Sequence, residues 1–150
     1  MIQLSGIGHV LLRVTDLDRA KAFYTEVLGF EIVEEDPEHG GTFMALPGQS
    51  HAIDLFPVRD LEAARRQTPG VRGLGHIAFR VDSEARLREA WAGLRERGVP
   101  ILRTVDHVSQ KSLYFEDPDG NTLEIYYELP NAREMFLEGR VDRDAPLTFE

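Results

Sequence analysis

The 150-residue sequence contains no cysteine. This absence excludes a disulfide scaffold, cysteine-ligated zinc, an iron–sulfur cluster and a thiol nucleophile, which leaves His, Asp, Glu and Tyr to carry any chemistry. Long apolar runs are also missing, since no stretch approaches the roughly 18 consecutive residues of a membrane span. The first ten residues lack the basic and apolar regions of a secretory signal. We therefore expect a protein that folds in the cytoplasm and does not bind a membrane.

Positive charge is scarce, because 17 Lys and Arg residues stand against 26 Asp and Glu residues and give a formal charge of −9. Nucleic-acid binding relies on clustered Lys and Arg that neutralise phosphates, so we expect no nucleic-acid partner. Hydrophobic residues make up 42% of the chain, which is enough to bury a sizeable core at this length. The composition predicts a folded protein of one domain.

The chain contains an internal repeat. Residues 8–14 (GHVLLRV) match residues 75–81 (GHIAFRV), with Gly, His, Arg and Val identical at equivalent positions. Apolar residues at helical spacing follow each copy and end at Gly29 and Gly98, and three short runs typical of strands come next. The pattern predicts an α+β fold built from two βαβββ modules.

The boundaries of these modules follow from the same pattern. We assign residues 1–150 to one domain, in which the modules span about 5–58 and 73–128, a linker spans about 59–72 and a tail spans 129–150. After the repeated strands, the expected strands are residues 31–35, 42–46 and 52–56 in the first module and residues 101–105, 112–116 and 122–127 in the second. A short helix is expected over 61–66 and a turn over 117–121. The tail, which has no evident chemistry, is expected to be either a helix around 132–137 or a partly ordered arm.

Two equivalent histidines and one carboxylate form a candidate metal site. His9 and His76 occupy the same position of the repeated strand, on the face opposite its hydrophobic residues, and are expected to converge between the modules. Glu124 lies on the polar face of the last strand. Two imidazoles and a carboxylate are the ligands that hold Fe(II) or Mn(II) while leaving coordination positions open. The alternative is that the histidines are structural and Glu124 is solvated.

The repeat, residues 21–30 (KAFYTEVLGF) and residues 112–125 (SLYFEDPDGNTLEI) together resemble the vicinal oxygen chelate superfamily. That superfamily includes glyoxalases, extradiol dioxygenases and fosfomycin or bleomycin resistance proteins. The resemblance covers roughly residues 5–128. It implies that the modules form a half-open barrel around a metal held by His9, His76 and Glu124, and that the protein is a homodimer.

The segments beside these ligands most resemble one-domain type I extradiol dioxygenases of the catechol 2,3-dioxygenase kind. In residues 107–114 (HVSQKSLY), His107 and Tyr114 match an active-site His and Tyr of those enzymes, and His51 matches their acid–base histidine. The resemblance implies an Fe(II)-dependent enzyme, with Mn(II) as the alternative metal, that acts on a small aromatic diol and O2. His51 would then transfer protons, while His107 and Tyr114 would orient the diol and stabilise its developing anion.

Other readings stay open. Asp54 aligns with Glu124 in the repeat, and as a fourth ligand it would suit a glyoxalase-like or epimerase-like lyase or isomerase with Zn(II), Ni(II) or Co(II). A fosfomycin-type transferase and a small-molecule-binding resistance protein are further alternatives. His51 and Asp54 are three residues apart, so a regular strand would point them to opposite faces unless a bulge intervenes or the strand begins after His51. Taken singly, each of these side chains also fits an ordinary structural role.

Overall fold

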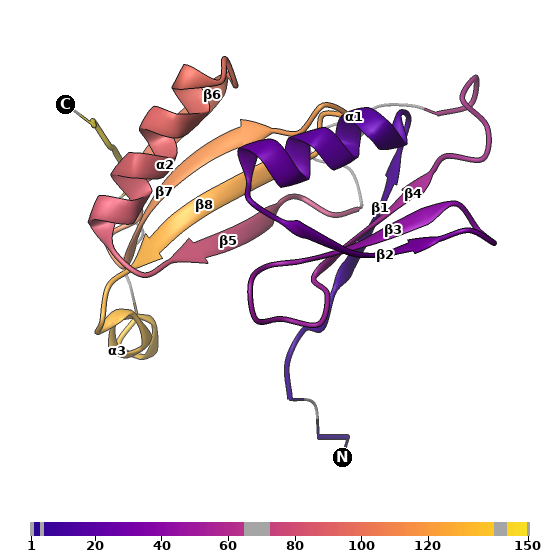
Figure 1. Ribbon diagram of the computed structural model, residues 1–150. Helices are drawn as coiled ribbons and strands as arrows, with labels where there is room; N and C mark the ends of the chain where they lie inside the picture. The colour runs from indigo at the N-terminus through magenta and orange to yellow at the C-terminus, as the bar shows by residue number, and fades with distance from the viewer. Residues whose placement is uncertain (1, 4, 65–72, 140–143, 150) are drawn as a thin grey trace. The chain divides into compact units, whose positions relative to one another are not determined.

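The computed structural model describes residues 2–3, 5–64, 73–139 and 144–149 (Figure 1). It divides into two compact units, Met1–Arg66 and Gln67–Glu150. Each unit contains one open, mixed sheet with a helix packed on it, so the predicted α+β class is confirmed. Among the described residues, no helix is both long enough and apolar enough to cross a membrane.

The first unit has the predicted βαβββ order. Its elements are β1 (Val10–Val14), α1 (Leu17–Ala22), a π-helical segment η1 (Phe23–Val27), β2 (Glu31–Asp36), β3 (Gly41–Ala45) and β4 (Ile53–Pro57). The strands lie in the order β1-β4-β3-β2, with β1 and β4 parallel and the other neighbours antiparallel. Asp16 caps α1 by accepting a hydrogen bond from the backbone N–H of Arg19.

The helical stretch of this unit differs from the single helix that the apolar spacing up to Gly29 predicts. The chain is α-helical only as far as Ala22 and continues as a π-helix to Val27. Within this stretch the Thr25 hydroxyl donates to the carbonyl of Lys21, four residues earlier, at 2.9 Å. Side-chain bonding to that carbonyl bends helices, and short π-helical turns occur where the regular ladder is disturbed.

The second unit repeats this order and adds two elements. It contains β5 (Ile77–Val81), α2 (Glu84–Glu96), β6 (Ile101–Asp106), β7 (Gln110–Glu116), β8 (Thr122–Glu128), α3 (Ala132–Leu137) and β9 (Ala145–Pro146). The strands lie in the order β5-β8-β7-β6-β9, again with the first two parallel. The duplication seen in the sequence is therefore confirmed in the strand order. The predicted helix over 132–137 is also confirmed.

Strand register makes the two modules equivalent residue by residue. Asp54 of β4 lies opposite Phe43 of β3, and Glu124 of β8 lies opposite Tyr114 of β7. The alignment of Asp54 with Glu124 is therefore confirmed in three dimensions. Phe43 is the counterpart of Tyr114, so the two modules differ by a hydroxyl group at this position.

The linker does not form the predicted helix in its described part. Residues 61–63 form a turn, while residues 65 and 66 lie outside the described residues. The Asp60 carboxylate accepts hydrogen bonds from the backbone N–H groups of Glu62 and Ala63, which favours a local turn over helix propagation. The expected turn over 117–121 is present, because Asp117 accepts from the N–H groups of Asp119 and Asn121.

Alternation along β7 and β8 separates an apolar side from a polar side. Leu113 and Phe115 of β7 and Leu123 of β8 are fully buried hydrophobic residues, and α2 packs on these two strands (Figure 1). The intervening positions hold Tyr114 and Glu124, which are also buried. A sheet that buries polar groups on one side needs partners for them there. This polar side carries the candidate site residues Tyr114 and Glu124.

Candidate metal centre

In the second unit, His76 and Glu124 form a pair that two neighbouring parallel strands, β5 and β8, bring together. His76 directly precedes β5, and its Nε2 atom lies 3.0 Å from Oε2 of Glu124 in β8. Glu124 is buried, with 2% of its surface exposed. Its other oxygen, Oε1, accepts a hydrogen bond from Nε2 of Gln110 at 3.1 Å. Two of the predicted metal ligands are therefore adjacent, with a third side chain fixing the carboxylate.

Tyr114 adds a buried phenol beside this pair. Its ring contacts His76 edge-on, with centroids 5.8 Å apart, and its hydroxyl oxygen lies 3.0 Å from Nε2 of His107. Burial raises the pKa of Tyr114 to about 12, and the negative charge of Glu124 acts in the same direction. The guanidinium of Arg103, a residue of β6, lies 4.2 Å from the centroid of the Tyr114 ring. The phenol is thus a neutral group at physiological pH.

His107 is held from its other side by the C-terminal tail. Its Nδ1 atom lies 2.7 Å from Oδ1 of Asp144, which immediately precedes β9. Asp144 was missed by sequence reasoning, which saw no chemistry in the tail. No local pattern marks it, because its partner lies 37 positions earlier in the chain. The contact depends on the pairing of β9 with β6. A strand of only two residues, Ala145–Pro146, has no sequence pattern that would predict this pairing.

A strained turn after β6 carries His107 and leads into Gln110, the first residue of β7. Val108 has φ of 68° and is the only non-glycine residue with positive φ among the described residues. The N–H of Ser109 donates to the carbonyl of His107 at 2.7 Å, which closes a three-residue γ-turn around Val108. A β-branched residue in this region costs about 1–3 kcal/mol and persists only where its surroundings enforce it.

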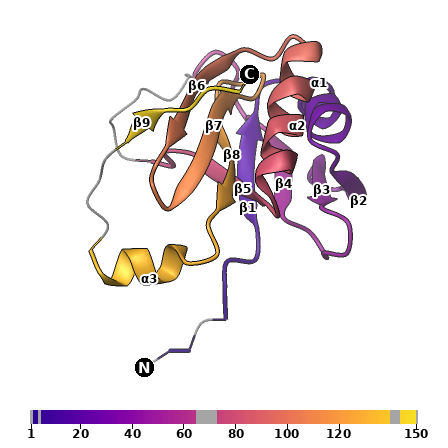
Figure 2. The same ribbon diagram turned by 90° about the vertical axis from the view of Figure 1, so that its left-hand side faces the viewer.

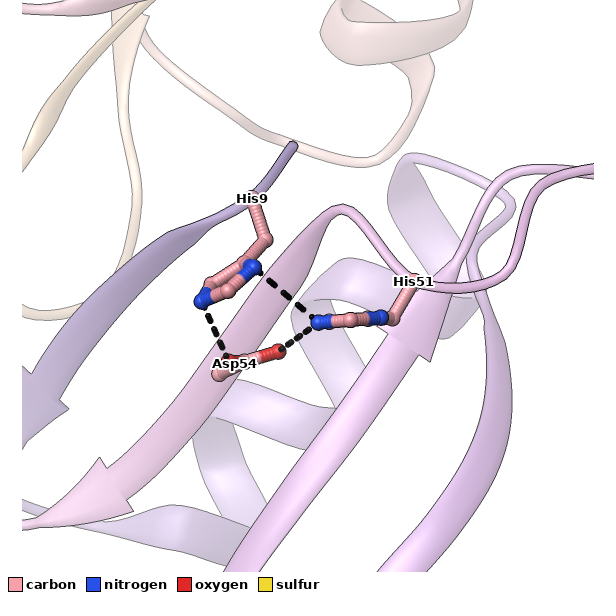
Figure 3. A group of neighbouring side chains, drawn as sticks. All are labelled: His9, His51 and Asp54. Carbon is pink, nitrogen blue, oxygen red and sulfur yellow. Dashed lines mark hydrogen bonds and ion pairs between the residues drawn. The ribbon is translucent and has the colours of Figure 1, made fainter. Parts of the chain in front are cut away.

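In the first unit, His9, His51 and Asp54 form a cluster (Figure 3). Nε2 of His9 lies 3.5 Å from Oδ2 of Asp54, and Nε2 of His51 lies 3.1 Å from Nδ1 of His9 and 3.9 Å from Oδ1 of Asp54. His51 precedes β4, which begins at Ile53, so the strand alternation does not constrain it. The second of the two expected solutions, a strand beginning after His51, is therefore the one observed.

The donor atoms of this cluster fit a divalent cation. One ligand atom from each residue lies within 4.8 Å of the others. Asp54 is buried, and its Oδ1 has no hydrogen-bond partner. A buried carboxylate oxygen without a hydrogen-bond donor is costly, and a cation would satisfy it. Imidazole and carboxylate ligands suit iron, manganese, zinc, nickel and cobalt alike.

The predicted site residues thus fall into two groups of neighbours. The second unit brings together His76, Glu124, Tyr114 and His107, and the first brings together His9, His51 and Asp54.

Comparison with known proteins gives a family match over most of the chain. The family described as "Glyoxalase/Bleomycin resistance protein/Dioxygenase superfamily" matches residues 6–125. "Uncharacterized protein YwkD" of Bacillus subtilis is 34% identical over 129 residues, covering 82% of this chain and 97% of that protein. "Biphenyl-2,3-diol 1,2-dioxygenase 2" of Rhodococcus globerulus is 26% identical over 135 residues, covering 88% and 69%.

A solved structure supports the same fold. The glyoxylase/bleomycin resistance protein/dioxygenase domain from Frankia sp. EAN1pec matches with a TM-score of 0.73 and 26% identity, covering 88% of this chain and 99% of that one.

The activities named among the relatives differ. "Lactoylglutathione lyase" of Schizosaccharomyces pombe is 28% identical over 142 residues, covering 79% of this chain and 46% of that protein. "Metallothiol transferase FosB" of Shouchella clausii is 32% identical over 130 residues, covering 82% and 80%. Similarity therefore identifies the fold and its relatives, and the choice among reactions depends on the side chains of this chain.

Proposed function

Because the chain belongs to the glyoxalase/bleomycin resistance protein/dioxygenase superfamily, we propose that it is an extradiol dioxygenase that cleaves a catechol-type aromatic diol with O2. In this proposal His9, His76 and Glu124 hold Fe(II), with Mn(II) as the alternative metal. One observation carries the choice of reaction. The buried Tyr114 hydroxyl, hydrogen-bonded to His107, lies beside the His76–Glu124 pair, whereas its counterpart in the first unit is Phe43.

The metal, when bound, supplies Lewis acidity, redox activity and open coordination positions for two reactants. The protein supplies the geometry of the ligands. Gln110 donates to Oε1 of Glu124 and leaves Oε2 directed at His76, so the carboxylate is already oriented. Such supporting hydrogen bonds around metal ligands typically change metal affinity or activity 10–100-fold when removed.

Tyr114 and His107 orient the diol and stabilise its developing negative charge through hydrogen bonds. With a pKa of about 12, the phenol keeps its proton and is able to donate it in a hydrogen bond to an oxygen that becomes anionic. The Arg103 guanidinium over the ring adds positive charge at the same place. Both features favour a substrate whose reacting oxygen becomes more negative during the reaction.

His51 is the proposed group for proton transfer. Its Nε2 atom points at His9 and Asp54 (Figure 3). We expect this atom to take a proton from the diol and later to return one to the product. Imidazole is the side chain best suited to exchange a proton near neutral pH. The side chain is 34% exposed, which gives that proton a route to solvent.

A second candidate is a lyase or isomerase that does not use oxygen. Asp54 is the counterpart of Glu124, lies 3.5 Å from His9 and has one oxygen without a hydrogen-bond partner. These features favour Asp54 as a fourth ligand for Zn(II), Ni(II) or Co(II). A fourth ligand would occupy a position that the dioxygenase reaction needs open.

The proposal extends to a cytoplasmic homodimer. In the described part of the first unit, β2 is one of the two edge strands of the sheet and carries Ile32 and Val33, both more than 40% exposed. Exposed apolar edges are commonly covered by association with a second chain. Sedimentation at several protein concentrations tests this part of the proposal, and a monomer throughout would contradict it.

The experiment for the activity is anaerobic loading with Fe(II), followed by catechol and then air, with oxygen uptake and the yellow ring-fission product as readouts. We expect turnover in the wild type and in His39→Ala, a matched control whose histidine pairs with Asp36 on the β2–β3 turn. His76→Ala is expected to abolish turnover. Tight metal binding without oxygen uptake for any catechol would overturn the dioxygenase and favour the second candidate.

A further inference from the structure

The end of the tail is fixed onto the second unit. β9 pairs with the last residues of β6 (Figure 2). The Thr104 hydroxyl donates to the carbonyl of Leu147 at 2.6 Å. Phe149 is buried and packs against Trp91 of α2, with ring centroids 5.6 Å apart. Asp144 stands at the start of this docked segment. Its carboxylate is therefore placed by backbone pairing on one side and by its contact with His107 on the other.

Two contacts of the His107 ring bear on where its hydrogen lies. Nδ1 lies 2.7 Å from Oδ1 of Asp144, and an ionised carboxylate only accepts hydrogen bonds, so Nδ1 must carry the hydrogen. A neutral imidazole has one N–H group, which leaves Nε2 as an acceptor 3.0 Å from the Tyr114 hydroxyl. We infer that Asp144 is a positioning residue that holds His107 in the Nδ1–H tautomer, so that Tyr114 donates its hydroxyl hydrogen to His107.

The backbone of His107 is restrained as well as its ring. The γ-turn around Val108 ties the carbonyl of His107 to Ser109, and the N–H of His107 donates to the carbonyl of Gln110 at 2.8 Å. Strain at Val108 is typical of sites where the backbone fixes the direction of a functional side chain, here that of His107. The arrangement belongs to the second unit, because Phe43, the counterpart of Tyr114, has no hydroxyl group to donate.

The orientation of the hydroxyl has a consequence that rests on the proposed function. With its hydrogen directed at His107, the Tyr114 oxygen, which also has Glu124 and Ser112 within hydrogen-bonding distance, keeps a lone pair that can accept from a diol hydroxyl. Because a hydroxyl rotates about its C–O bond, the same group can turn toward the diol oxygen once that oxygen carries charge. Without Asp144, the carboxylate that holds the hydrogen on Nδ1 is gone, so the imidazole can carry it on Nε2 and donate to the Tyr114 oxygen in place of a substrate hydroxyl.

Nitrogen NMR of the full chain tests the tautomer directly and needs neither metal nor turnover. The metal-free protein is labelled with ¹⁵N-histidine and examined at about pH 8, above the usual imidazole pKa of about 6.5. His107→Gln assigns the signal among the five histidines. We expect the ¹⁵N chemical shift of Nδ1 of His107 to be that of a nitrogen bearing a hydrogen, and the shift of Nε2 to be that of a nitrogen without one. In Asp144→Ala we expect the two shifts to exchange.

Two control variants separate positioning from a general effect on the fold. Glu138→Ala removes an exposed acidic residue at the end of α3 and should leave the His107 shifts unchanged. Tyr114→Phe should also leave the tautomer unchanged, because Asp144 sets it. An Nε2–H tautomer in the wild type, or an unaltered tautomer in Asp144→Ala with the fold intact by circular dichroism, would overturn the inference.

Steady-state kinetics then connect the tautomer to the proposed reaction. In Asp144→Ala we expect kcat to fall about 10-fold, with KM changed by less than about 2-fold. Asp144→Glu, which keeps the carboxylate, should recover part of the loss. An unchanged kcat together with a switched tautomer would overturn the role of Asp144 in turnover. Absence of oxygen uptake in the wild type would overturn the proposed reaction instead, and the NMR result would decide the role of Asp144 by itself.

Discussion

Asp54 and Glu124 occupy equivalent positions of the duplicated sheet, each opposite an aromatic residue of the neighbouring strand. Their carboxylates nevertheless have different surroundings. Glu124 receives a hydrogen bond from Gln110 and lies against His76, whereas one oxygen of Asp54 has no hydrogen-bond partner. The duplicated halves have therefore diverged. The second unit holds an oriented carboxylate, Glu124, beside the phenol of Tyr114. The first unit holds two histidines around Asp54, whose Oδ1 has no hydrogen-bond partner.

The first prediction concerns metal binding by Glu124. A ligand that binds only the folded state at 100 times its Kd stabilises a protein by about 2.7 kcal/mol. We expect Mn(II) at that concentration to raise the free energy of unfolding of the wild type by about this amount. In Glu124→Gln the gain at the same concentration should fall below about 1 kcal/mol, because a ligating carboxylate has become an amide.

Denaturant unfolding with and without Mn(II) measures this difference. Glu128→Gln is the matched control, since Glu128 lies on the same strand and pairs with Arg80. It should retain the full stabilisation by metal. An equal metal-dependent gain in Glu124→Gln and the wild type would show that Glu124 is not a ligand.

The second prediction uses the raised pKa of Tyr114, about 12 in the folded protein against an ordinary value of 10.0. Between these pH values the unfolded chain has lost the phenolic proton and the folded protein still holds it. Stability must therefore fall as pH rises from about 10 to 12, by about 2 to 3 kcal/mol for this group. The full contribution is present below pH 10.

Unfolding free energies of wild type and Tyr114→Phe in metal-free buffer isolate this effect from other groups that titrate in alkali. As pH rises from about 10 to 12, the free energy of unfolding of the wild type should fall relative to that of Tyr114→Phe. A difference that stays constant between pH 9 and pH 12 would mean that the phenol of Tyr114 titrates normally.

Local sequence patterns were enough to predict the strands, the helix over 132–137 and the turn at Asp117, because each depends on residues a few positions apart. The likeness of Asp54 to Glu124 was also readable, since duplication preserves register. The contact between Asp144 and His107 was not, because it arises from a tail strand of two residues docking on β6. The π-helical segment η1 and the positive φ of Val108 likewise reflect competition among backbone and side-chain hydrogen bonds that apolar spacing does not encode.

The third prediction concerns the strain at Val108. Glycine adopts positive φ without steric cost, so Val108→Gly should raise the free energy of unfolding by about 1 kcal/mol despite the greater entropy of its unfolded chain. Val105→Gly, three residues earlier in β6, is the matched control. It should lower stability by about 1 kcal/mol or more, because extended backbone gives glycine no advantage. Equal losses in the two variants would show that Val108 is not strained.

The last prediction decides whether Asp54 is a metal ligand. In the metal-free protein, Asp54→Asn should raise the free energy of unfolding by about 1 kcal/mol, because it removes a buried charge whose nearest imidazole nitrogens, at 3.5 and 3.9 Å, lie beyond ordinary hydrogen-bond distance. Asp18→Asn is the control, since the side chain of Asp18 is 93% exposed and its change should stay within about 0.5 kcal/mol.

Metal titration of the same variants separates the two candidate reactions. If three ligands hold the metal, as the dioxygenase requires, Asp54→Asn should weaken metal binding by less than about 10-fold and retain oxygen uptake, because Asp54 then lies outside the ligand set. A loss as large as that of Glu124→Gln would make Asp54 a fourth ligand. The position needed for dioxygen would then be filled, and the chemistry would have to be that of an oxygen-independent lyase or isomerase.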